Sequence, residues 1–493
     1  MRLLNLIASS EGLTLQGEDK EILGLTADSR KVERGFLFVA IPGTQHDGRA
    51  YIKDAIERGA AALLVPEGTN VSPLSNNIAV LKAQDLRIAL ATIAATFYPH
   101  QPKIIAAVTG TSGKTSTTQF TREIWTKLGH KSASMGSLGF ILPDEARYSA
   151  LNTPETIRLH QQLEEAVTKG ISHLVMEASS HGLALHRMDQ VRVGIGAFTN
   201  LSRDHLDFHS DMNEYFAAKL RLFTEILSPT GVAVVNADIL EFEALARHLK
   251  DRSIKTLTYG KAGKDIKLHS LQPHERGQIV KFELFGKAHE IQLPIIGKFQ
   301  AWNSLCALGI VVGSGDDPLT AVAAMNHVSG VTGRLELTGY TPSGGAIFVD
   351  YAHKPDALEN VLAALRPHVE AHKGAKLGVI FGCGGNRDKG KRPLMGQIAQ
   401  RLADWVIVTD DNPRHEDAAA IRRDVLAGCK PGTDLREISD RASAIKIGIE
   451  RLRQGDVLII AGKGHESGQI IGDEILPFDD AEVARHVLSE AVA

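Results

Sequence analysis

A glycine-rich loop between a predicted buried strand and a predicted helix constrains this chain more than any other stretch. The loop reads VTGTSGKTS over Val108–Ser116; it follows the apolar run 104–108 and precedes a helical pattern that ends at Gly129. Loop amides and a helix N-terminus both present N–H groups to an anion. The stretch therefore predicts a phosphate site, with Lys114 as a mobile cation and the hydroxyl of Thr115 near Mg²⁺.

The loop departs from the general nucleotide-binding pattern at one position. That pattern has a glycine where this chain has Val108, so the loop is a shortened variant. A generic kinase or transport ATPase is therefore disfavoured. A glycine turn with an exposed lysine and no ligand is the alternative interpretation, but a strand and a helix both stand where a phosphate site requires them.

Length and composition limit the class of protein. The 493 residues suggest about three domains of ~150 residues each. A net charge of −3 offers no broad basic face to nucleic acid, and no apolar run approaches the ~20 residues of a membrane span. Three scattered cysteines without a CxxC pair suit a reducing compartment. We expect a cytoplasmic protein without nucleic-acid or membrane partners.

Hydrophobic periodicity divides the chain into three regions and predicts an α/β fold class. Residues 1–98 mix short strands and helices, which predicts a small N-terminal α/β domain. Residues 99–332 alternate strand and helix patterns, which predicts a central P-loop-type domain with a mostly parallel sheet and helices on both faces. Within it we expect an antiparallel appendage at 264–297 and then a helix from about Trp302.

The third region, residues 333–493, predicts a C-terminal Rossmann-like α/β domain. It contains four apolar, strand-like runs, and each of them ends in a loop of polar or charged residues. In a parallel sheet such loops share one edge, where ligands bind.

Two further polar clusters follow predicted strands of the central region. One is MEASSH, with Glu177, and the other is NLSRDHLDFH, with His205. Beside a phosphate loop they predict a site for Mg²⁺ and ATP, in which the carboxylate is a natural ligand and the imidazole a less usual one. A zinc hydrolase site is the competing interpretation; it would use Asp204, His205, Asp207 and His209. The phosphate loop explains the carboxylates without zinc.

Motifs from all three regions resemble those of the Mur ligase family. They are GTSGKTS, MEASSHGL, FTNLSRDHLDFH with YFAAK, GRLE, VDYAHKPDAL, FGCGGNRDKGKRPLMG, TDDNPRHED and AGKGHE, in the family's order from about residue 26 to 466. The resemblance implies an ATP- and Mg²⁺-dependent amide ligase of peptidoglycan precursor synthesis that acts through an acyl phosphate. The chain is most similar to the members that add meso-diaminopimelate to UDP-MurNAc-L-Ala-D-Glu, and we expect a monomer.

Other members and relatives of the family remain alternatives. A lysine-adding or D-Ala-D-Ala-adding ligase is one, and a non-catalytic nucleotide-binding homologue is another. Folylpolyglutamate ligases share the loop but would not explain the DNPR motif at 411–414.

The resemblance implies roles for individual residues. Those implied for ATP are Gly110, Thr111, Ser112, Gly113, Lys114, Thr115, Ser116, Asn303, Arg334 and Asp350, with His353 a weaker candidate. Those implied for catalysis are Lys114, Glu177, His205 and Lys219, and those for the metal are Thr115, Glu177, His205 and Lys219, the last as a carbamate. From chemistry alone, Lys219 reads instead as a lysine that lays its stem along the core.

The two remaining substrates have their own implied residues. Those for the UDP-sugar peptide are Ser29, Asn152, Thr153, Ser179 and Arg187, with the loop Thr44–His46 near uracil. Those for diaminopimelate are Arg387, Asp411, Asn412, Pro413, Arg414, Gly462 and Glu466. Leu185 stands where the family commonly has glutamine, and Asn152 where it often has threonine.

Amino-acid choice depends on Arg414. Diaminopimelate carries one more carboxylate than lysine, and a guanidinium can clamp a carboxylate through two hydrogen bonds. Outside its motif, this residue would be interpreted as a surface arginine.

Overall fold

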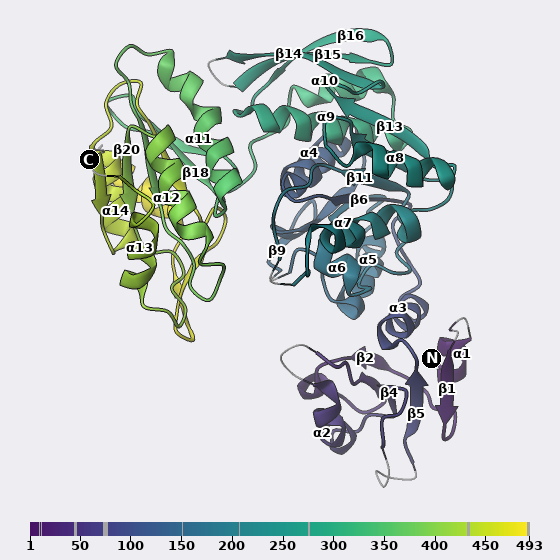
Figure 1. Ribbon diagram of the computed structural model, residues 1–493. Coiled ribbons are helices and arrows are strands. Elements are labelled where there is room, and N and C mark those ends of the chain that lie inside the picture. The colour runs from purple at the N-terminus through teal and green to yellow at the C-terminus, as the bar shows by residue number, and fades with distance from the viewer. Residues whose placement is uncertain are drawn as a thin grey trace. The chain divides into compact units, whose positions relative to one another are not determined.

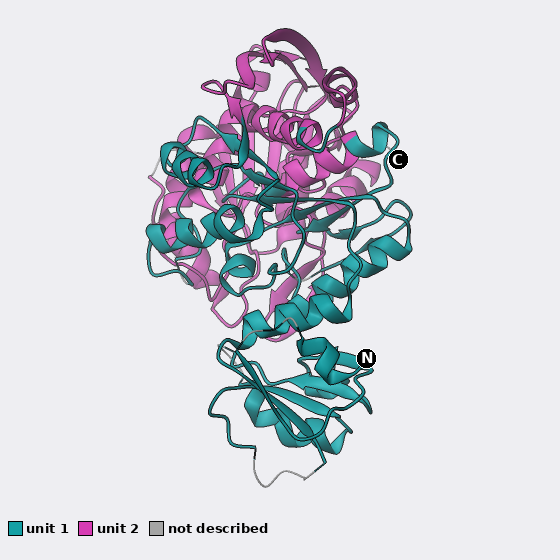
Figure 2. Cartoon of the chain, turned by 90° about the vertical axis from the view of Figure 1, so that its right-hand side faces the viewer, with its two compact units in different colours: residues 1–114, 125–257, 313–315 teal, residues 115–124, 258–312, 316–493 magenta. Residues whose placement is uncertain are grey.

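The computed structural model describes residues 1–493 except 9, 11, 44–46, 72–76, 150, 207, 275–276, 431–433 and 491–493. Thr44–His46 and Asp207, singled out above, thus lie outside the described residues. The chain forms two compact units (Figure 2). Unit 1 comprises residues 1–114, 125–257 and 313–315, and unit 2 comprises residues 115–124, 258–312 and 316–493.

The N-terminal part of unit 1 is a small five-stranded sheet with the strand order β1-β5-β4-β3-β2 (Figure 1). Its strands are β1 (Leu13–Gln16), β2 (Gly24–Thr26), β3 (Phe36–Val39), β4 (Ala62–Pro66) and β5 (Ala79–Ala83), and its helices are α1 (Leu3–Ile7), α2 (Ile52–Glu57) and α3 (Leu86–Phe97). Only β1 pairs antiparallel, with β5. The side chain of Asp85 begins α3 by accepting the N–H groups of Arg87 and Ile88.

The central part of unit 1 contains the predicted mostly parallel sheet. Neighbouring strands follow the order β12-β11-β6-β10-β7-β8-β9. The first five of these pair in parallel, and β8 and β9 add an antiparallel edge that the sequence did not predict. The strands are β6 (Ile104–Thr109), β7 (Ser132–Gly136), β8 (Gly139–Ile141), β9 (Ala146–Arg147), β10 (His173–Glu177), β11 (Ile195–Phe198) and β12 (Val232–Asn236).

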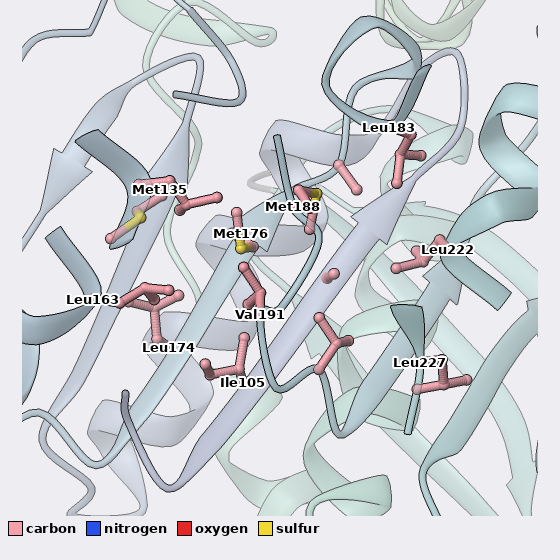
Figure 3. Close-up of a cluster of buried hydrophobic side chains, with 14 of the residues drawn as sticks. Ile105, Met135, Leu163, Leu174, Met176, Leu183, Met188, Val191, Leu222 and Leu227 are labelled. Carbon is pink, nitrogen blue, oxygen red and sulfur yellow. The ribbon is translucent and has the colours of Figure 1, made fainter. Parts of the chain in front are cut away.

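Helices cover this sheet and bury an apolar core. They are α5 (Thr156–Thr168), α6 (Ser180–Ala184), α7 (Met212–Arg221), which continues as a π-helical turn at Leu222–Ile226, and α8 (Phe242–Asp251). The helix α4 (Lys114–Lys127), which follows β6 in the chain, is divided between the two units. Figure 3 shows side chains of the strands, such as Ile105 and Met176, with Leu163 from α5 and Leu222 after α7 in one buried cluster. Because β6 lies between β10 and β11, the carboxyl ends of these three strands share one edge.

The antiparallel appendage predicted at 264–297 is present in unit 2. Its strands β14 (Ile266–His274), β15 (Gly277–Leu284) and β16 (Lys287–Leu293) form an antiparallel ribbon. The next helix, α9 (Lys298–Gly313), begins earlier than the predicted Trp302. Gly297, at φ 104°, bends the chain directly before it in a conformation that favours glycine, and the helix begins at the next residue. It is followed by α10 (Pro318–Met325).

The C-terminal part of unit 2 has a six-stranded sheet with the order β17-β18-β22-β19-β20-β21. The four predicted apolar runs are β18 (Ala346–Asp350), β19 (Leu377–Phe381), β20 (Trp405–Val408) and β22 (Val457–Ala461), which are adjacent and parallel. Separate apolar clusters cover the two faces of the sheet, which explains why these strands are apolar throughout.

The other elements of this part are shorter or more polar. They are β17 (Glu336–Tyr340), β21 (Asp434–Glu437), the hairpin β23 (Gly468–Ile471) and β24 (Glu474–Pro477), and the helices α11 (Pro355–Glu370), α12 (Lys391–Leu402), α13 (Ala418–Leu426), α14 (Arg441–Glu450) and α15 (Asp480–Glu490). The strand β13 (Lys255–Gly260) does not belong to this part: it pairs in parallel with β14 of the antiparallel ribbon. Among the helices that the structure describes, none is both long and apolar enough to cross a bilayer.

Candidate active site

The glycine-rich loop connects β6 to α4 as the sequence predicts. Gly110 has φ 140°, and a Cβ there would lie 1.9 Å from Oγ1 of Thr199, so only glycine fits. The ammonium of Lys114 donates to the carbonyls of Gly110 and Thr111, both at 2.9 Å. The lysine therefore folds back over its own loop.

The end of β11 holds the loop from the other side. The backbone N–H of Ser112 donates to Oδ1 of Asn200 at 2.9 Å, and Nδ2 of Asn200 returns a bond of 3.1 Å to the carbonyl of Ser112. From the sequence, Asn200 appeared only within the motif NLSRDHLDFH, and no contact with the loop was predicted for it. Its position directly after a predicted strand was the signal for this role.

Lys219 of α7 is buried under the loop, with 1% of its surface exposed. Its ammonium donates to the carbonyl of Gly110 at 2.8 Å and lies 4.4 Å from the ring centre of Tyr215. The hydroxyls of Tyr215 and Thr111 are 3.2 Å apart, and burial raises the pKa of this phenol. A lysine that covered the core with its stem would have an exposed ammonium, so the interpretation from chemistry alone is wrong.

Glu177, at the end of β10, is 1% exposed and firmly held. Its Oε1 accepts the backbone N–H of Ser137 at 2.8 Å, and its Oε2 accepts the hydroxyl of the same serine at 3.2 Å. Gly136 makes room for the carboxylate, because a Cβ there would lie 2.3 Å from Oε1. Neither Ser137 nor Gly136 was a predicted site residue, since β7 was not predicted as a strand.

His205 lies in the loop after β11, in a left-handed conformation at φ 52°. Its Nε2 is 3.2 Å from the carboxylate of Asp204, and its side chain is 40% exposed. The ring of His181 is 4.8 Å from that of His205, measured between centroids. His209, which belongs to the alternative zinc site, has a buried side chain beside the ring of Tyr215.

Three of the residues implied for the sugar peptide form one hydrogen-bonded group. The hydroxyl of Thr153 donates to the carbonyl of Glu177 at 2.9 Å and accepts the backbone N–H and hydroxyl of Ser179, each at 3.0 Å. The guanidinium of Arg187 donates to the carbonyl of Thr153 at 3.1 Å. Asn152 beside them is exposed, whereas Ser29 is buried in the turn after β2 of the N-terminal sheet.

In unit 2, Arg334 lies with residues implied for the nucleotide. Its guanidinium stacks 4.3 Å from the ring centre of Tyr351 and is 3.5 Å from the hydroxyl of Thr115. Asp350, at the end of β18, is buried and accepts the backbone N–H of Leu335 at 2.7 Å and that of Ala352 at 2.8 Å. Burial raises the pKa of Asp350 to about 6, although Arg334 opposes the shift.

Asn303 and His353 lie in other elements of unit 2. Asn303 is buried in α9, where its amide donates to Oε1 of Gln300 at 2.9 Å. His353 follows β18, and its ring is 4.5 Å from that of Tyr351.

The residues implied for diaminopimelate converge at the carboxyl ends of β19, β20 and β22. Arg414 has φ 53°, and its guanidinium donates to the carbonyl of Gly385 at 2.9 Å. A Cβ at Gly384 would lie 2.8 Å from that guanidinium and 3.8 Å from Cγ of Arg387, so the glycine keeps space between the two arginines. Burial and the neighbouring charge of Arg387 lower the pKa of Arg414.

The acceptors of this group are Asp411, Asn412 and Glu466. The amide of Asn412 donates to Oε2 of Glu466 at 3.0 Å. Asp411 is buried, and a Cβ on Gly462 would lie 2.8 Å from its Oδ2, so glycine is required there as well. Two arginines, Arg387 and Arg414, and two carboxylates, Asp411 and Glu466, therefore form one corner at the ends of these strands. Such a corner suits a ligand that carries both carboxylate and ammonium groups.

Comparison with known proteins agrees with this arrangement. Residues 21–98 match the model described as Mur ligase family, catalytic domain, residues 108–311 the Mur ligase middle domain, and residues 333–464 the Mur ligase, glutamate ligase domain. A curated protein of Bradyrhizobium diazoefficiens is 45% identical over all of both chains. The chain belongs to the Mur ligase family.

The Mur ligase relatives with curated names agree among themselves. The Bradyrhizobium protein is a UDP-N-acetylmuramoyl-L-alanyl-D-glutamate–2,6-diaminopimelate ligase, as is one from Agrobacterium fabrum that is 44% identical over 95% of this chain and 94% of its own. A solved structure of a ligase with that name matches at TM-score 0.69 and 32% identity, covering 96% of each chain. A MurF ligase of Thermotoga maritima in complex with ADP, at 19% identity and TM-score 0.63, covers 96% of this chain and 98% of its own and shares the fold.

Proposed function

We propose that this Mur ligase joins meso-diaminopimelate to the γ-carboxylate of D-Glu in UDP-MurNAc-L-Ala-D-Glu, with hydrolysis of ATP to ADP and phosphate. The observation that carries the proposal is the pair Arg387 and Arg414 at the corner that also holds Glu466. Guanidinium groups suit the carboxylates of a diamino diacid, and Glu466 suits its ammonium. The names of the full-length relatives support the same substrate.

The reaction needs an activated acyl group, because a carboxylate is a poor acyl donor. An oxygen of the γ-carboxylate attacks the γ-phosphorus of ATP, and the bond to the β–γ bridging oxygen breaks to release ADP. The amine of diaminopimelate then adds to the acyl phosphate, loses a proton, and the tetrahedral intermediate expels phosphate. Lys114 and the loop amides of 110–116 would stabilise the phosphate charge, and Asn303, Arg334 and Asp350 would hold the nucleotide.

The donor set also fits Mg²⁺, which prefers oxygen ligands. Glu177 presents a buried carboxylate whose oxygens Ser137 orients, and Thr115 presents a hydroxyl. His205 and a carbamylated Lys219 would complete the ligands. Mg²⁺ would neutralise charge that develops on the transferring phosphoryl group.

The remaining assignments belong to the same proposal. The UDP-sugar peptide would be bound by Ser29, Asn152, Thr153, Ser179 and Arg187. The chain would be organised as three domains, 1–98, 99–332 and 333–493. We infer a cytoplasmic protein, because the free cysteines Cys306, Cys383 and Cys429 suit a reducing compartment. We also propose that the chain is a monomer. Sedimentation of the purified chain at several concentrations tests the monomer.

A panel of amino acids tests the proposal. ADP release is measured with UDP-MurNAc-L-Ala-D-Glu and, in turn, meso-diaminopimelate, lysine and D-Ala-D-Ala, with Lys114→Ala as the inactive control. We expect ADP release and tripeptide formation with diaminopimelate at kcat/KM at least about tenfold above lysine. Equal or better turnover of lysine would indicate the lysine-adding activity. ATP binding without ADP formation under any combination would indicate a non-catalytic homologue.

A further inference from the structure

Lys463 is a fully buried lysine that the reaction described above does not use. It lies two residues after β22, in the loop that carries Glu466, and 0% of its surface is exposed. Its ammonium donates to Oδ1 of Asn412 at 3.1 Å, lies 3.5 Å from Oε2 of Glu466, and donates to the carbonyl of Gly468. An ammonium has three N–H donors, so these three acceptors match it completely.

The bond to Lys463 decides which way the amide of Asn412 points. Oδ1 of Asn412 accepts from Lys463 and also from the backbone N–H of Ile470 at 2.9 Å. With both acceptor directions taken, Nδ2 is left to donate to Oε2 of Glu466, as it does at 3.0 Å. The buried ammonium therefore orients Asn412, and through it Glu466.

The backbone around Lys463 has little freedom to move the ammonium elsewhere. Gly462 has φ 121° and Gly464 has φ 55°. A Cβ on Gly464 would lie 2.7 Å from Cβ of Tyr351 and 2.8 Å from the carbonyl of Gly333. The lysine thus stands between two glycines that permit close packing on both sides. Burial of its charge is stable only because the acceptors of Asn412, Glu466 and Gly468 are in place.

The strand β23 adds to the same arrangement. The side chain of Gln469 donates to the carbonyl of Asp411 at 2.7 Å, and the backbone N–H of Arg414 donates to the carbonyl of Ile470 at 3.0 Å. The carbonyl of Gly468, which Lys463 holds, begins this strand. One ammonium therefore connects the strand, the 411–414 turn and the loop of Glu466.

We propose that Lys463 is a positioning residue for recognition of the amino acid. It holds Asn412 and the carboxylate of Glu466, whose side chain is 34% exposed, in the orientation that receives the substrate ammonium. The inference rests on the proposed function, because it assigns Lys463 to the step in which the amino acid binds. It acts through Asn412 and Glu466 and does not touch the substrate.

Two variants of the full chain test this role. Lys463→Met keeps most of the volume and removes all three N–H donors, whereas Lys463→Gln keeps an N–H donor without charge. Lys446→Met is the matched control, because Lys446 is a half-exposed lysine of α14 outside this corner. Steady-state kinetics gives kcat and the KM for diaminopimelate, lysine, ATP and the UDP-dipeptide, and thermal unfolding reports whether each variant is folded.

We expect Lys463→Met to raise KM for diaminopimelate about 10- to 100-fold, the usual cost of a lost charged hydrogen bond. Lys463→Gln should fall between Lys463→Met and the wild type. KM for ATP and for the UDP-dipeptide should stay within about twofold of the wild type. KM for lysine should rise in parallel with that for diaminopimelate, because Lys463 acts on the ammonium contact that both amino acids share.

Three results would overturn the proposal. They are an unchanged KM for diaminopimelate in folded Lys463→Met, equal rises in all KM values, and failure of both variants to fold, which would make the lysine a requirement of the fold. A wild-type chain that turns over no amino acid would instead contradict the proposed function itself, so the two failures are distinguishable.

Discussion

The ammonium of Lys219 donates a hydrogen bond of 2.8 Å to the carbonyl of Gly110, the first glycine of the glycine-rich loop. A residue of α7 thereby contacts the loop after β6 across 109 positions of sequence. The ring of Tyr215, 4.4 Å from the same ammonium, covers it from one side. Any change at Lys219 therefore acts on the loop itself.

Lys219→Ala should lose most activity, by about 100-fold or more, because an electrostatic group next to the transferring phosphate is removed. If the lysine is carbamylated, short carboxylates added to the assay should restore part of the ADP release. Lys127→Ala, at the exposed end of α4, is the control and should match the wild type. Wild-type turnover in Lys219→Ala would reject the role. Loss without recovery would assign the effect to the bond with Gly110 and not to a carbamate.

Arg414→Ala should raise KM for diaminopimelate about 10- to 100-fold and leave KM for lysine within about threefold, since lysine lacks the carboxylate that the guanidinium would bind. The ratio of the two kcat/KM values measures this selectivity directly. Arg423→Ala is the control, because Arg423 of α13 is 66% exposed and pairs only with Asp417 within the described residues. A parallel loss for both amino acids would contradict the proposed role of Arg414 in amino-acid choice.

Asp350 gives the free energy of unfolding a defined pH dependence. Burial raises the pKa of this carboxyl from the ordinary 3.8 to about 6, so the folded state holds its proton more tightly than the unfolded state. Its contribution to stability is therefore complete below about pH 3.8 and is lost as pH rises through about 6.

Asp350→Asn should remove this dependence. The difference in free energy of unfolding, wild type minus variant, should fall as pH rises from about 4 to about 6 and become flat above about 7. The variant also replaces one acceptor by a donor facing a backbone N–H, of Leu335 or Ala352, which adds a cost that does not vary with pH. Denaturant unfolding at a series of pH values measures the difference. A difference that is constant across this range would show that Asp350 does not titrate there.

Arg441 and Asp480 form an ion pair in which neither side chain is exposed, with two N···O distances of 2.7 Å. Arg441→Met should destabilise the chain by about 3–5 kcal/mol because it leaves a buried carboxylate without its partner. The double variant Arg441→Met, Asp480→Leu should recover part of that loss.

Urea unfolding of the single and double variants measures the coupling between Arg441 and Asp480. The exposed pair Arg401 and Glu359 is the control, and Arg401→Ala should cost at most about 1 kcal/mol. A single variant at 441 that is as stable as the wild type would mean that the pair contributes nothing.

The sequence predicted what depends on local pattern. The runs that became β6, β10, β11 and the four central strands of the C-terminal sheet are long and apolar, and the chemistry follows directly after each of them. Gly110 and Glu177 could therefore be found as candidates from local pattern, whereas Arg414 became a candidate only through the resemblance of its motif to the family. The antiparallel ribbon at 264–297 was also recognisable, because one face of it is buried and residues alternate.

The sequence could not predict what depends on contacts between distant segments. Ser137, directly after β7, holds Glu177 across 40 positions, and β7 itself reads SASMG, a run that suggests no strand. Lys463 holds Asn412 across 51 positions, and a lone lysine after a strand looks like a surface residue. The hairpin β23–β24 is exposed and short, so its apolar content did not stand out.

Gly136 carries a consequence for how mutations at this site can be interpreted. Its backbone lies outside the left-handed region, so any residue could adopt it, and the three atoms nearest to an added Cβ all belong to the side chain of Glu177, with Cγ and Cδ both at 2.7 Å. The set of residues tolerated at position 136 therefore reports how far the Glu177 carboxylate can shift while turnover persists. A saturation library at this one position would measure the shift that the Glu177 carboxylate tolerates, without any change to Glu177 itself.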